Sequence, residues 1–576
     1  MNYFILIWEE ILMKKSFFVV LFFFVTSGIA LSPKATSLTY AVANPEEVLL
    51  GDINSDSSID SIDLACMKKY LVGKIPGLPG EEKGLIAADI DKSGKVDSID
   101  IAHLKNYLIG KGTIPPTPVE DEIVVFENEY LKSIVLKELA KNSNDLIYKS
   151  ELDKIEALFL YEPIDLSEII FFDNLKILYI SFSDTSDISP LAKFTNLTHL
   201  QLNSANITDI SLLKDFTQLT YLDLGGNKIS DISALENLTN LTHLNLSSNN
   251  ISDITPLKNL NKLTYLSLSG NNLSDLSAIK NLTELNHLYL SYNNISDISP
   301  LKNLNKLYSL DLSSNNLKDL SPLKTLSNLH DLRLPGNNIS DLTALENLTN
   351  LSELDLSQNS INDISTVRNF TSLICLDLSS NDINNISSLE NLSQLYFLNL
   401  SENSVSDISP LSNLANITYL YLSGNNINDI SPLKNLTMLV NLYISDNNIE
   451  DISPLKNLTK LTDLTLNGNN ISEISALENL TNLIILSLSD NNVSDASVLK
   501  NLTNIYYLFL SNNNISDISS LGNLTKLFDL DISNNNISDI SSLGSLVNLY
   551  YLNLSGNKIV DLSPLLNLTE LKNVQY

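Results

Sequence analysis

The most regular feature of this sequence is a leucine pattern that repeats every 22 residues. Pairs of the form Leu-x-Leu or Leu-x-Ile begin at 178, 200 and 222 and continue at the same interval to 552, which makes eighteen repeats without an insertion. One repeat, residues 238–259, reads LTNLTHLNLSSNNISDITPLKN. Its leucine and isoleucine side chains cannot be buried within so short a unit, so neighbouring repeats must stack into a continuous core. The pattern therefore predicts a solenoid over residues 176–576.

Each repeat contains the signals of a short strand and a tight turn. Leu244 and Leu246 alternate with polar residues, as expected for a strand with one buried face. Thr255-Pro256 fits a cap followed by a proline in the first turn of a 3-10 helix. We therefore predict an α/β leucine-rich-repeat solenoid, with a parallel sheet on its concave side and 3-10 turns on its convex side. After Leu565 only part of a further repeat follows.

Two polar columns recur with the leucines. Asn249 has counterparts in sixteen of the eighteen repeats, and an inward amide of this kind can satisfy backbone groups of adjacent coils. Asp253 belongs to a column of sixteen Asp with one Glu and one Asn. We expect each of these side chains to accept a local backbone hydrogen bond as a turn cap. A calcium-lined column is the alternative, but hard cations need several converging oxygen ligands.

The residues on either side of the first leucine are predicted to face the concave surface. They are aromatic near both ends of the array and acidic around Arg333 in the middle. Exposed aromatic side chains with polar neighbours are typical of binding faces, whereas aromatic residues also simply favour strands. The predicted ligand-binding residues of this face are Tyr265, Tyr289, Tyr419, Tyr421 and Tyr443.

The segment before the repeats divides into four parts. Lys14 and Lys15 precede an apolar run, so residues 1–43 are predicted to be a cleaved secretory signal, with Met13 as a possible true start. Residues 49–113 form a domain described below. The proline-rich residues 114–122 read as a linker, and residues 123–175 show helical spacing expected of an N-terminal cap.

A loop and a helix occur twice within residues 49–113, 37 residues apart. The copies read GDINSDSSIDSIDLACMKKYLVG and ADIDKSGKVDSIDIAHLKNYLIG, and each begins with oxygen-bearing residues at the spacing of a calcium loop. Two calcium ions are therefore predicted. The ligand residues are Asp52, Asn54, Asp56, Asp60 and Asp63 in the first copy, and Asp89, Asp91, Ser93, Asp97 and Asp100 in the second.

This small all-α segment resembles a type I dockerin, the module by which secreted enzymes of cellulolytic anaerobic bacteria dock onto cohesins of a scaffoldin. The resemblance implies that loop positions 10 and 11 and polar helix residues contact the cohesin. These are Ser61, Ile62, Lys68 and Lys69 in the first copy, and Ser98, Ile99, Lys105 and Asn106 in the second. Because both copies carry Ser-Ile, the resemblance implies binding in two orientations. The N-terminal placement departs from the family, whose members usually carry the module at the C-terminus.

The repeats resemble the leucine-rich repeats of bacterial internalins, whose arcs bind protein or glycan on the concave side. The wall-anchoring signal and the trailing immunoglobulin-like domain of internalins are absent from this sequence. The likeness is specific for fold and weak for function, because the fold has many partners.

Charge and composition narrow the functional classes. With 67 acidic and 36 basic side chains the net charge is −31, which disfavours binding to nucleic acid or anionic lipid. Neither a nucleophile–base pair nor a phosphate loop interrupts the repeats, so we expect no enzyme activity. The sequence predicts a secreted, cellulosome-associated protein that binds a scaffoldin cohesin and an unknown protein or polysaccharide, with no membrane span after signal cleavage. The alternatives are an adhesin or carbohydrate-binding protein on plant cell wall, and an inhibitor or regulator of secreted enzymes.

Overall fold

The computed structural model of the chain describes residues 50–54, 58–72, 74, 78–79, 87–91, 95–111, 121–162, 164–181 and 186–576. The predicted signal at 1–43 and residues 114–120 of the predicted linker lie outside these residues. The chain divides into two compact units at Asp121 and Glu122. No helix of the described residues is long and apolar enough to cross a membrane.

The first unit is built around two helices of equal length, α2 (Ser61–Leu71) and α4 (Ser98–Leu108). Both helices begin with an aspartate N-cap inside a capping box, which satisfies backbone N–H groups that the first turn leaves without partners. Between the helices lies a small apolar core, whose fully buried residues include Met67 and Leu104. The two copies therefore fold alike and pack on each other.

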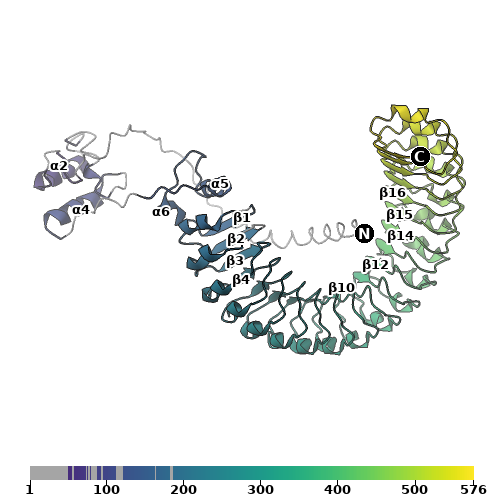
Figure 1. The fold of residues 1–576 in the computed structure, drawn as a ribbon, viewed down its shortest axis with the longest axis horizontal. Helices are drawn as coiled ribbons and strands as arrows, with labels where there is room; N and C mark the ends of the chain where they lie inside the picture. Colours follow the sequence, from purple (N-terminus) through teal and green to yellow (C-terminus); the bar gives the residue numbers. More distant parts are fainter. Residues whose placement is uncertain are drawn as a thin grey trace. The chain divides into compact units, whose positions relative to one another are not determined.

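The second unit starts with two helices, α5 (Glu129–Glu138) and α6 (Lys149–Leu152), and continues as the solenoid (Figure 1). Its strands form one parallel sheet in which each strand pairs with the next along the chain. The strands are β1 Ala157–Leu160, β2 Ile177–Ser181, β3 His199–Asn203, β4 Tyr221–Asp223, β5 His243–Asn245, β6 Tyr265–Ser267, β7 His287–Tyr289, β8 Ser309–Asp311, β9 Asp331–Arg333, β10 Glu353–Asp355, β11 Cys375–Asp377, β12 Phe397–Asn399, β13 Tyr419–Tyr421, β14 Asn441–Tyr443, β15 Asp463–Thr465, β16 Ile485–Ser487, β17 Tyr507–Phe509, β18 Asp529–Asp531, β19 Tyr551–Asn553 and β20 Asn573–Gln575.

A short 3-10 helix follows each strand from β1 to β19, as the Thr-Pro signal predicts. One example is η6 (Thr255–Asn259), with proline in its first turn. In Figure 1 the strands line the inside of the arc and these turns lie on its outside. The leucines of the strand and turn point inward, and Leu244, Leu246 and Leu257 are each fully buried. The predicted leucine-rich-repeat fold is confirmed.

The asparagine column forms the predicted ladder. Nδ2 of Asn249 donates to the carbonyls of Leu224 and Leu246, at 3.0 and 3.1 Å. Its Oδ1 accepts the N–H of Ile229 at 2.9 Å. One side chain thus satisfies backbone groups of two coils, and the same bonds recur along the array, for example at Asn315 and Asn513.

The solenoid begins before the predicted residue 176, and its last strand forms without the leucine pair. The segment predicted as a helical cap contains α5 and α6, but it also holds strand β1 and the 3-10 helix η2 (Leu166–Phe171), which form a coil in front of β2. At the other end, β20 pairs with β19 although Asn573–Gln575 has lost the leucine pair. Partner strands supply the backbone pairing that these weaker sequences cannot specify by themselves.

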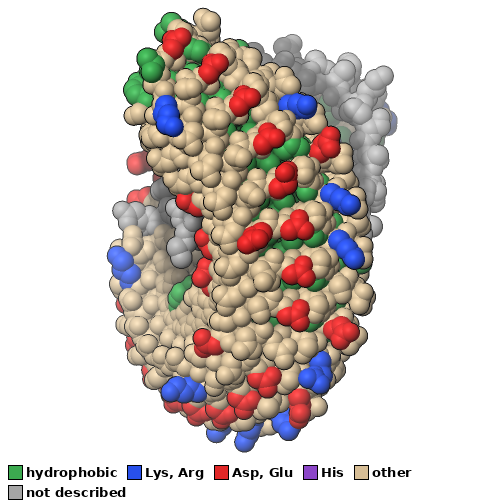
Figure 2. All heavy atoms as spheres, turned by 90° about the vertical axis from the view of Figure 1, so that its right-hand side faces the viewer, with side chains coloured by type: hydrophobic (Ala, Val, Ile, Leu, Met, Phe, Trp, Pro, Cys, Tyr) green, Lys and Arg blue, Asp and Glu red, His purple; other side chains and the backbone are tan. Residues whose placement is uncertain are grey.

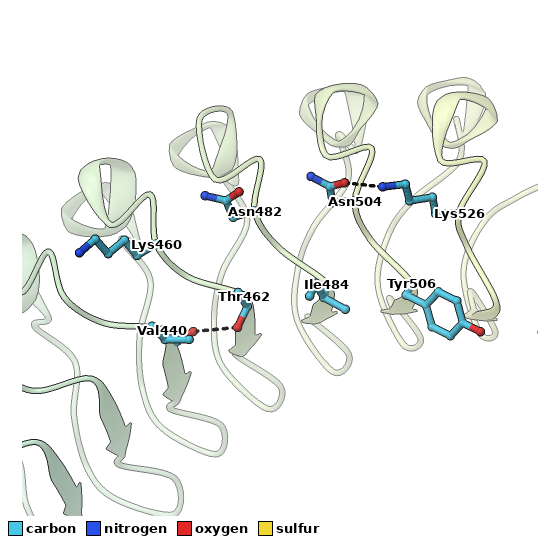
Figure 3. Close-up of a pocket in the computed structure, with 8 residues that line it drawn as sticks. All are labelled: Val440, Lys460, Thr462, Asn482, Ile484, Asn504, Tyr506 and Lys526. Carbon is cyan, nitrogen blue, oxygen red and sulfur yellow. Dashed lines mark hydrogen bonds between the residues drawn. The ribbon is translucent and has the colours of Figure 1, made fainter. Parts of the chain in front are cut away.

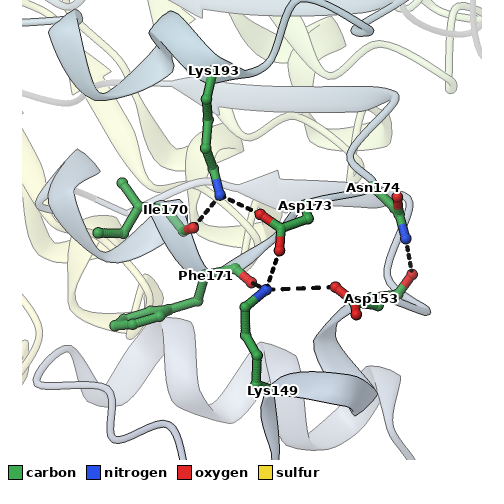
Figure 4. A network of polar contacts seen from close by, with 7 residues as sticks. All are labelled: Lys149, Asp153, Ile170, Phe171, Asp173, Asn174 and Lys193. Carbon is green, nitrogen blue, oxygen red and sulfur yellow. Dashed lines mark hydrogen bonds and ion pairs between the residues drawn. The ribbon is translucent and has the colours of Figure 1, made fainter. Parts of the chain in front are cut away.

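A polar network joins the cap to the first coils (Figure 4). Asp173 forms ion pairs with Lys149, on α6, and with Lys193, in the 3-10 helix η3 (Ser189–Lys193). Lys149 also donates to the carbonyl of Phe171 at 2.7 Å, and Lys193 donates to that of Ile170. Both lysines therefore hold the C-terminal end of η2, where backbone carbonyls have no helical partners.

Candidate functional site

The first candidate site is the pair of acidic loops in front of α2 and α4. In the first copy the closing residue Asp63 is fully buried. Its Oδ1 accepts the N–H groups of Ile53 at 2.8 Å and Asn54 at 3.1 Å, and its Oδ2 accepts the N–H of Asp60 at 2.8 Å. The second copy repeats these three bonds at the same distances, from Ile90, Asp91 and Asp97 to Asp100. The duplication in sequence is therefore a duplication in hydrogen bonding.

The donor set of these loops suits a hard cation. Carboxylate oxygens of Asp89, Asp91 and Asp100 lie within 4.8 Å of one another. Asp52 is buried and Asn54 half-buried in the first loop, beside Asp63. Oxygen ligands from carboxylates and amides are those that calcium prefers. The predicted ligands Asp56 and Ser93 lie outside the described residues.

Asp60 and Asp97 have a second role that the ligand spacing did not suggest. Each is the N-cap of its helix, and its Oδ1 accepts the N–H of Ile62 at 2.6 Å or of Ile99 at 2.7 Å. A carboxylate at this position also interacts favourably with the helix dipole. The helix start and the acidic loop are thus fixed by the same side chains.

The residues that the resemblance assigns to cohesin contact are on the surface. Ile62 and Ile99 are each 54% exposed, an unusual position for isoleucine, and they occupy equivalent places at the start of α2 and α4. All eight residues are exposed: Ser61, Ile62, Lys68, Lys69, Ser98, Ile99, Lys105 and Asn106. The unit therefore presents two similar faces, each with an exposed apolar side chain beside serine.

The second candidate site is the concave face of the solenoid. Over its N-terminal strands, histidine and tyrosine alternate and stack. The ring centroids of Tyr221 and His243 are 4.4 Å apart, and those of His243 and Tyr265 are 3.9 Å apart. Tyr265 also lies 5.4 Å from Tyr289, the second residue predicted in this region. Burial, with a smaller contribution from His287, lowers the pKa of His243 to about 4, so this histidine is neutral at pH 7.

The side chains of the second predicted aromatic group, on β13 and β14, are less exposed than the sequence suggests. Tyr421 is only 6% exposed, because its ring lies between Phe397, at 5.4 Å, and Tyr443, at 4.9 Å. Tyr419 and Tyr443 remain half-buried. Of the three tyrosines predicted here, Tyr421 therefore offers the least ring surface to a ligand, and its ring packs against those of its neighbours.

The middle of the concave face is acidic. Arg333 donates to Asp331 at 3.0 Å and lies 3.6 Å from Glu353, while Asp355 and Asp377 occupy the same position on the next two strands. Asp377 accepts hydrogen bonds from Ser379 and from Nδ2 of Asn399. Burial, and then repulsion from Asp377, raise the pKa of Asp355 to about 7, and burial also raises the pKa of Asp377.

These raised pKa values predict a pH-dependent stability. A carboxyl group whose pKa is higher in the folded than in the unfolded state contributes stability below the unfolded value, and this contribution is lost as pH rises through the folded value. We expect Asp377→Asn to increase the free energy of unfolding by about 2 kcal/mol at pH 8, and by much less at pH 4. The introduced amide would then stand beside Asp355 as Asn245 stands beside Asp223, to which Asn245 donates at 2.9 Å.

Urea unfolding of the wild type and variant at both pH values tests this expectation. The matched control is Asp319→Asn, in the exposed turn column where Asn385 already replaces aspartate. Equal stabilisation at pH 4 and pH 8 would contradict it.

The exposed aspartate column caps the turns, as predicted. Oδ1 of Asp253 accepts the N–H of Thr255 at 2.8 Å, and this backbone hydrogen bond lowers the pKa of Asp253. Figure 2 shows acidic side chains spaced along the outer face of the C-terminal coils. Over the described ranges, Asp89, Asp91 and Asp100 are the one group of potential ligands close enough to share a metal ion. The calcium-lined alternative for the column is therefore not supported.

Sequence reasoning missed one column, two residues before the first strand leucine. In the early coils this position is threonine, and Thr220 and Thr242 each donate a hydroxyl to a carbonyl of the preceding coil, at 3.2 and 3.1 Å. In several later coils it is apolar, and there Ile484 is 44% and Tyr506 37% exposed. The replacement of threonine at this repeat position is visible in the sequence and could have identified the column.

The comparisons with known proteins agree with both units. Residues 50–109 match the family model of the type I dockerin domain. The leucine-rich-repeat model matches 195–237, 217–259, 239–281, 283–325, 396–435, 437–479, 481–523 and 525–567, just over half of the chain. The chain belongs to the leucine-rich-repeat family and carries a type I dockerin domain. Both are non-catalytic binding modules, with a cohesin-docking and a protein-binding role, and type I dockerins bind calcium.

The chain is also similar to several solved structures. An internalin from Listeria monocytogenes is 29% identical over 80% of this chain and 99% of its own, with a TM-score of 0.35. A leucine-rich-repeat protein of Leptospira interrogans is 25% identical over 67% and 98%, with a TM-score of 0.57. The Arabidopsis receptor kinase HAESA, solved with a peptide hormone and a co-receptor, is 24% identical over 72% and 80%, with a TM-score of 0.53. Among curated proteins there is no match.

Proposed function

We propose that this chain is a secreted, non-enzymatic component of a cellulosome, which docks onto a scaffoldin cohesin and holds a ligand on its solenoid. The observation that carries the docking half is the duplicated loop and helix. Both copies keep the same hydrogen bonds to a buried closing aspartate, and both expose Ser-Ile at the helix start. This symmetry supports two interchangeable cohesin-binding faces.

The docking unit is proposed to hold two calcium ions, one in each loop. Asp52, Asn54 and Asp63 would contribute to the first ion, and Asp89, Asp91 and Asp100 to the second. Oδ2 of Asp63 and of Asp100 each accepts one backbone N–H and so keeps a lone pair for a cation. Bound calcium supplies positive charge that offsets the repulsion among these carboxylates. The closing aspartates Asp63 and Asp100 hold each loop against its helix, because they accept backbone N–H groups of the loop.

The solenoid half of the proposal rests on the concave face. Aromatic side chains bury much area at low entropic cost, and the aromatic strands β12 to β14 follow the acidic strands β9 to β11 in the sheet. Such a face suits a ligand with both apolar and polar groups. Cargo bound there would be brought to the scaffoldin by the docking unit.

The concave face can be tested by a double substitution, Tyr419→Ala with Tyr443→Ala. We expect the binding free energy of the physiological ligand to become less favourable by about 2 kcal/mol or more, because these half-buried rings line the proposed contact. Ligands would first be sought by pull-down on insoluble polysaccharides and on a panel of secreted cellulosomal proteins. The control is Tyr292→Ala, an aromatic side chain 69% exposed outside the strands. Undiminished capture by a variant with an unchanged melting profile would refute the role of this patch.

A further inference from the structure

A groove runs beside the concave sheet over the C-terminal coils, apart from the aromatic patch at Tyr443. Its first part is a cavity of about 610 Å³. Figure 3 shows two rows of side chains along it, one from the strand starts and one from the loops before them. A second cavity of about 460 Å³ shares Tyr506 and Lys526 with the first, so the two form one continuous groove.

The floor of the groove is mostly apolar, at a repeat position where the early coils have threonine. It consists of Val440, Thr462, Ile484 and Tyr506 in the first cavity, and it continues through Phe528 and Tyr550 in the second. The rings of Tyr506, Phe528 and Tyr550 are nearly parallel, with neighbouring centroids 5.0 and 5.2 Å apart. Threonine at this position bonds to the preceding coil, so the apolar residues replace a structural hydrogen bond with exposed carbon surface.

The wall of the groove carries cations that form no ion pair with a carboxylate among the described residues. Of the described residues that line the first cavity, Lys460 and Lys526 are the charged ones. Lys526 donates to Oδ1 of Asn504 at 2.8 Å, and Lys460 lies 3.0 Å from the sulfur of Met438. By contrast, Lys306, in the same column of an earlier coil, is ion-paired with Glu284 at 2.6 Å. In a chain with a net charge of −31, this groove is a local site for an anionic group.

Two asparagines, Asn482 and Asn504, complete the wall, and they lie one coil apart. Nδ2 of Asn482 and of Asn504 donates to a backbone carbonyl of the preceding coil at 2.8 Å, which fixes each amide oxygen as an acceptor. These acceptors recur at the coil spacing of ~4.8 Å. An extended peptide repeats its side chains on one side only every ~6.8 Å, which does not match the coil spacing.

We propose that this groove binds an acidic polysaccharide, with sugar rings against the floor, hydroxyl groups on the asparagine oxygens and carboxylates on Lys460 and Lys526. This inference rests on the proposed function, because it names a ligand class for the solenoid, but it uses a different surface from the Tyr443 patch. Glu570, which lines the second cavity, would repel a carboxylate and so marks the end of the groove.

Calorimetry of the full chain with a short oligomer of galacturonic acid tests the proposal. The same sugar with its carboxyl groups methyl-esterified, and polyglutamate, serve as the neutral and peptide probes. Two double variants remove the groove's features: Lys460→Gln with Lys526→Gln, and Ile484→Thr with Tyr506→Thr, which restores the threonine of the early coils. We expect each to weaken binding of the acidic sugar by about tenfold or more.

Matched controls use the same columns outside the groove. Lys262→Gln removes a lysine that donates to Asn240 at 2.8 Å, as Lys526 does to Asn504, and Tyr396→Thr removes a tyrosine that is 42% exposed. Both should bind the acidic sugar like the wild type. The Tyr419→Ala, Tyr443→Ala variant should also bind it normally, which separates this proposal from the concave-face contact.

The other outcomes overturn the proposal. Equal binding of the esterified sugar would show that the lysines do not select an anion, and preference for polyglutamate would show that the groove is a peptide site. No binding of the acidic sugar, or equal binding by the groove variants, would remove the groove as its site. The docking and concave-face functions would survive all of these results.

Discussion

Removal of calcium should abolish cohesin binding by the full chain, with a loss of about a hundredfold or more in affinity. Without a cation, the carboxylates of Asp89, Asp91 and Asp100 lie within 4.8 Å of one another and repel. The closing aspartates are buried and tie the loops to α2 and α4, so loosening the loops also loosens the small core around Met67. The measurement is gel shift or calorimetry with a type I cohesin, in calcium and in excess chelator.

The same assay tests the equivalence of the two copies. Replacing Ser61-Ile62 with Ala-Asp should leave binding largely intact, as should the same change at Ser98-Ile99, because each copy presents the same exposed face. Both changes together should remove binding. Asp253→Asn, in the turn column of the solenoid, is the control for loss of a carboxylate and should have no effect. Full binding in chelator, or by the four-residue variant, would refute the docking model.

The second large effect is expected at the asparagine ladder. Asn315→Ala should destabilise the solenoid by about 3 kcal/mol, because it leaves the buried N–H of Ile295 without its partner. Buried backbone groups have no water to replace it. The carbonyls of Leu290 and Leu312 each lose one of the two amide donors that they have, and keep the bond from Asn293 or Asn337. Urea unfolding measures the change in the free energy of unfolding. Hydrogen exchange should show that the loss of amide protection is concentrated in the adjacent coils, since each coil contacts mainly its neighbours.

The neighbouring residue gives a matched control. Asn316 is exposed, and its backbone N–H donates to the carbonyl of Ile295, a bond that alanine keeps. Asn316→Ala should therefore change the free energy of unfolding by less than about 0.5 kcal/mol. Similar losses for the two variants would mean that the amide bonds of the ladder contribute little.

The repeat itself is determined by the sequence. Because every coil contains the same 22-residue pattern, the burial of Leu244 and Leu246, the ladder of Asn249 and the turn cap of Asp253 could each be predicted from one coil. Their partners are either local or the identical position of the next coil, so the pattern contains both sides of each contact. The acidic loops before α2 and α4 were predictable for the same reason, since calcium-loop spacing is local.

Tertiary structure decided what depends on different side chains in adjacent coils. Tyr421 is covered by Phe397 and Tyr443, which belong to the coils on either side, so its burial cannot be read from its own strand. Strands β1 and β20 form because β2 and β19 offer them backbone partners, although their own sequences lack the leucine pair or stand outside the regular interval. The groove forms because mostly apolar side chains at the strand starts, and lysines of the preceding loops that pair with no described carboxylate, come together over several coils. Burial and charge pairing are properties of neighbours in space, and a periodic pattern specifies only the neighbours that repeat.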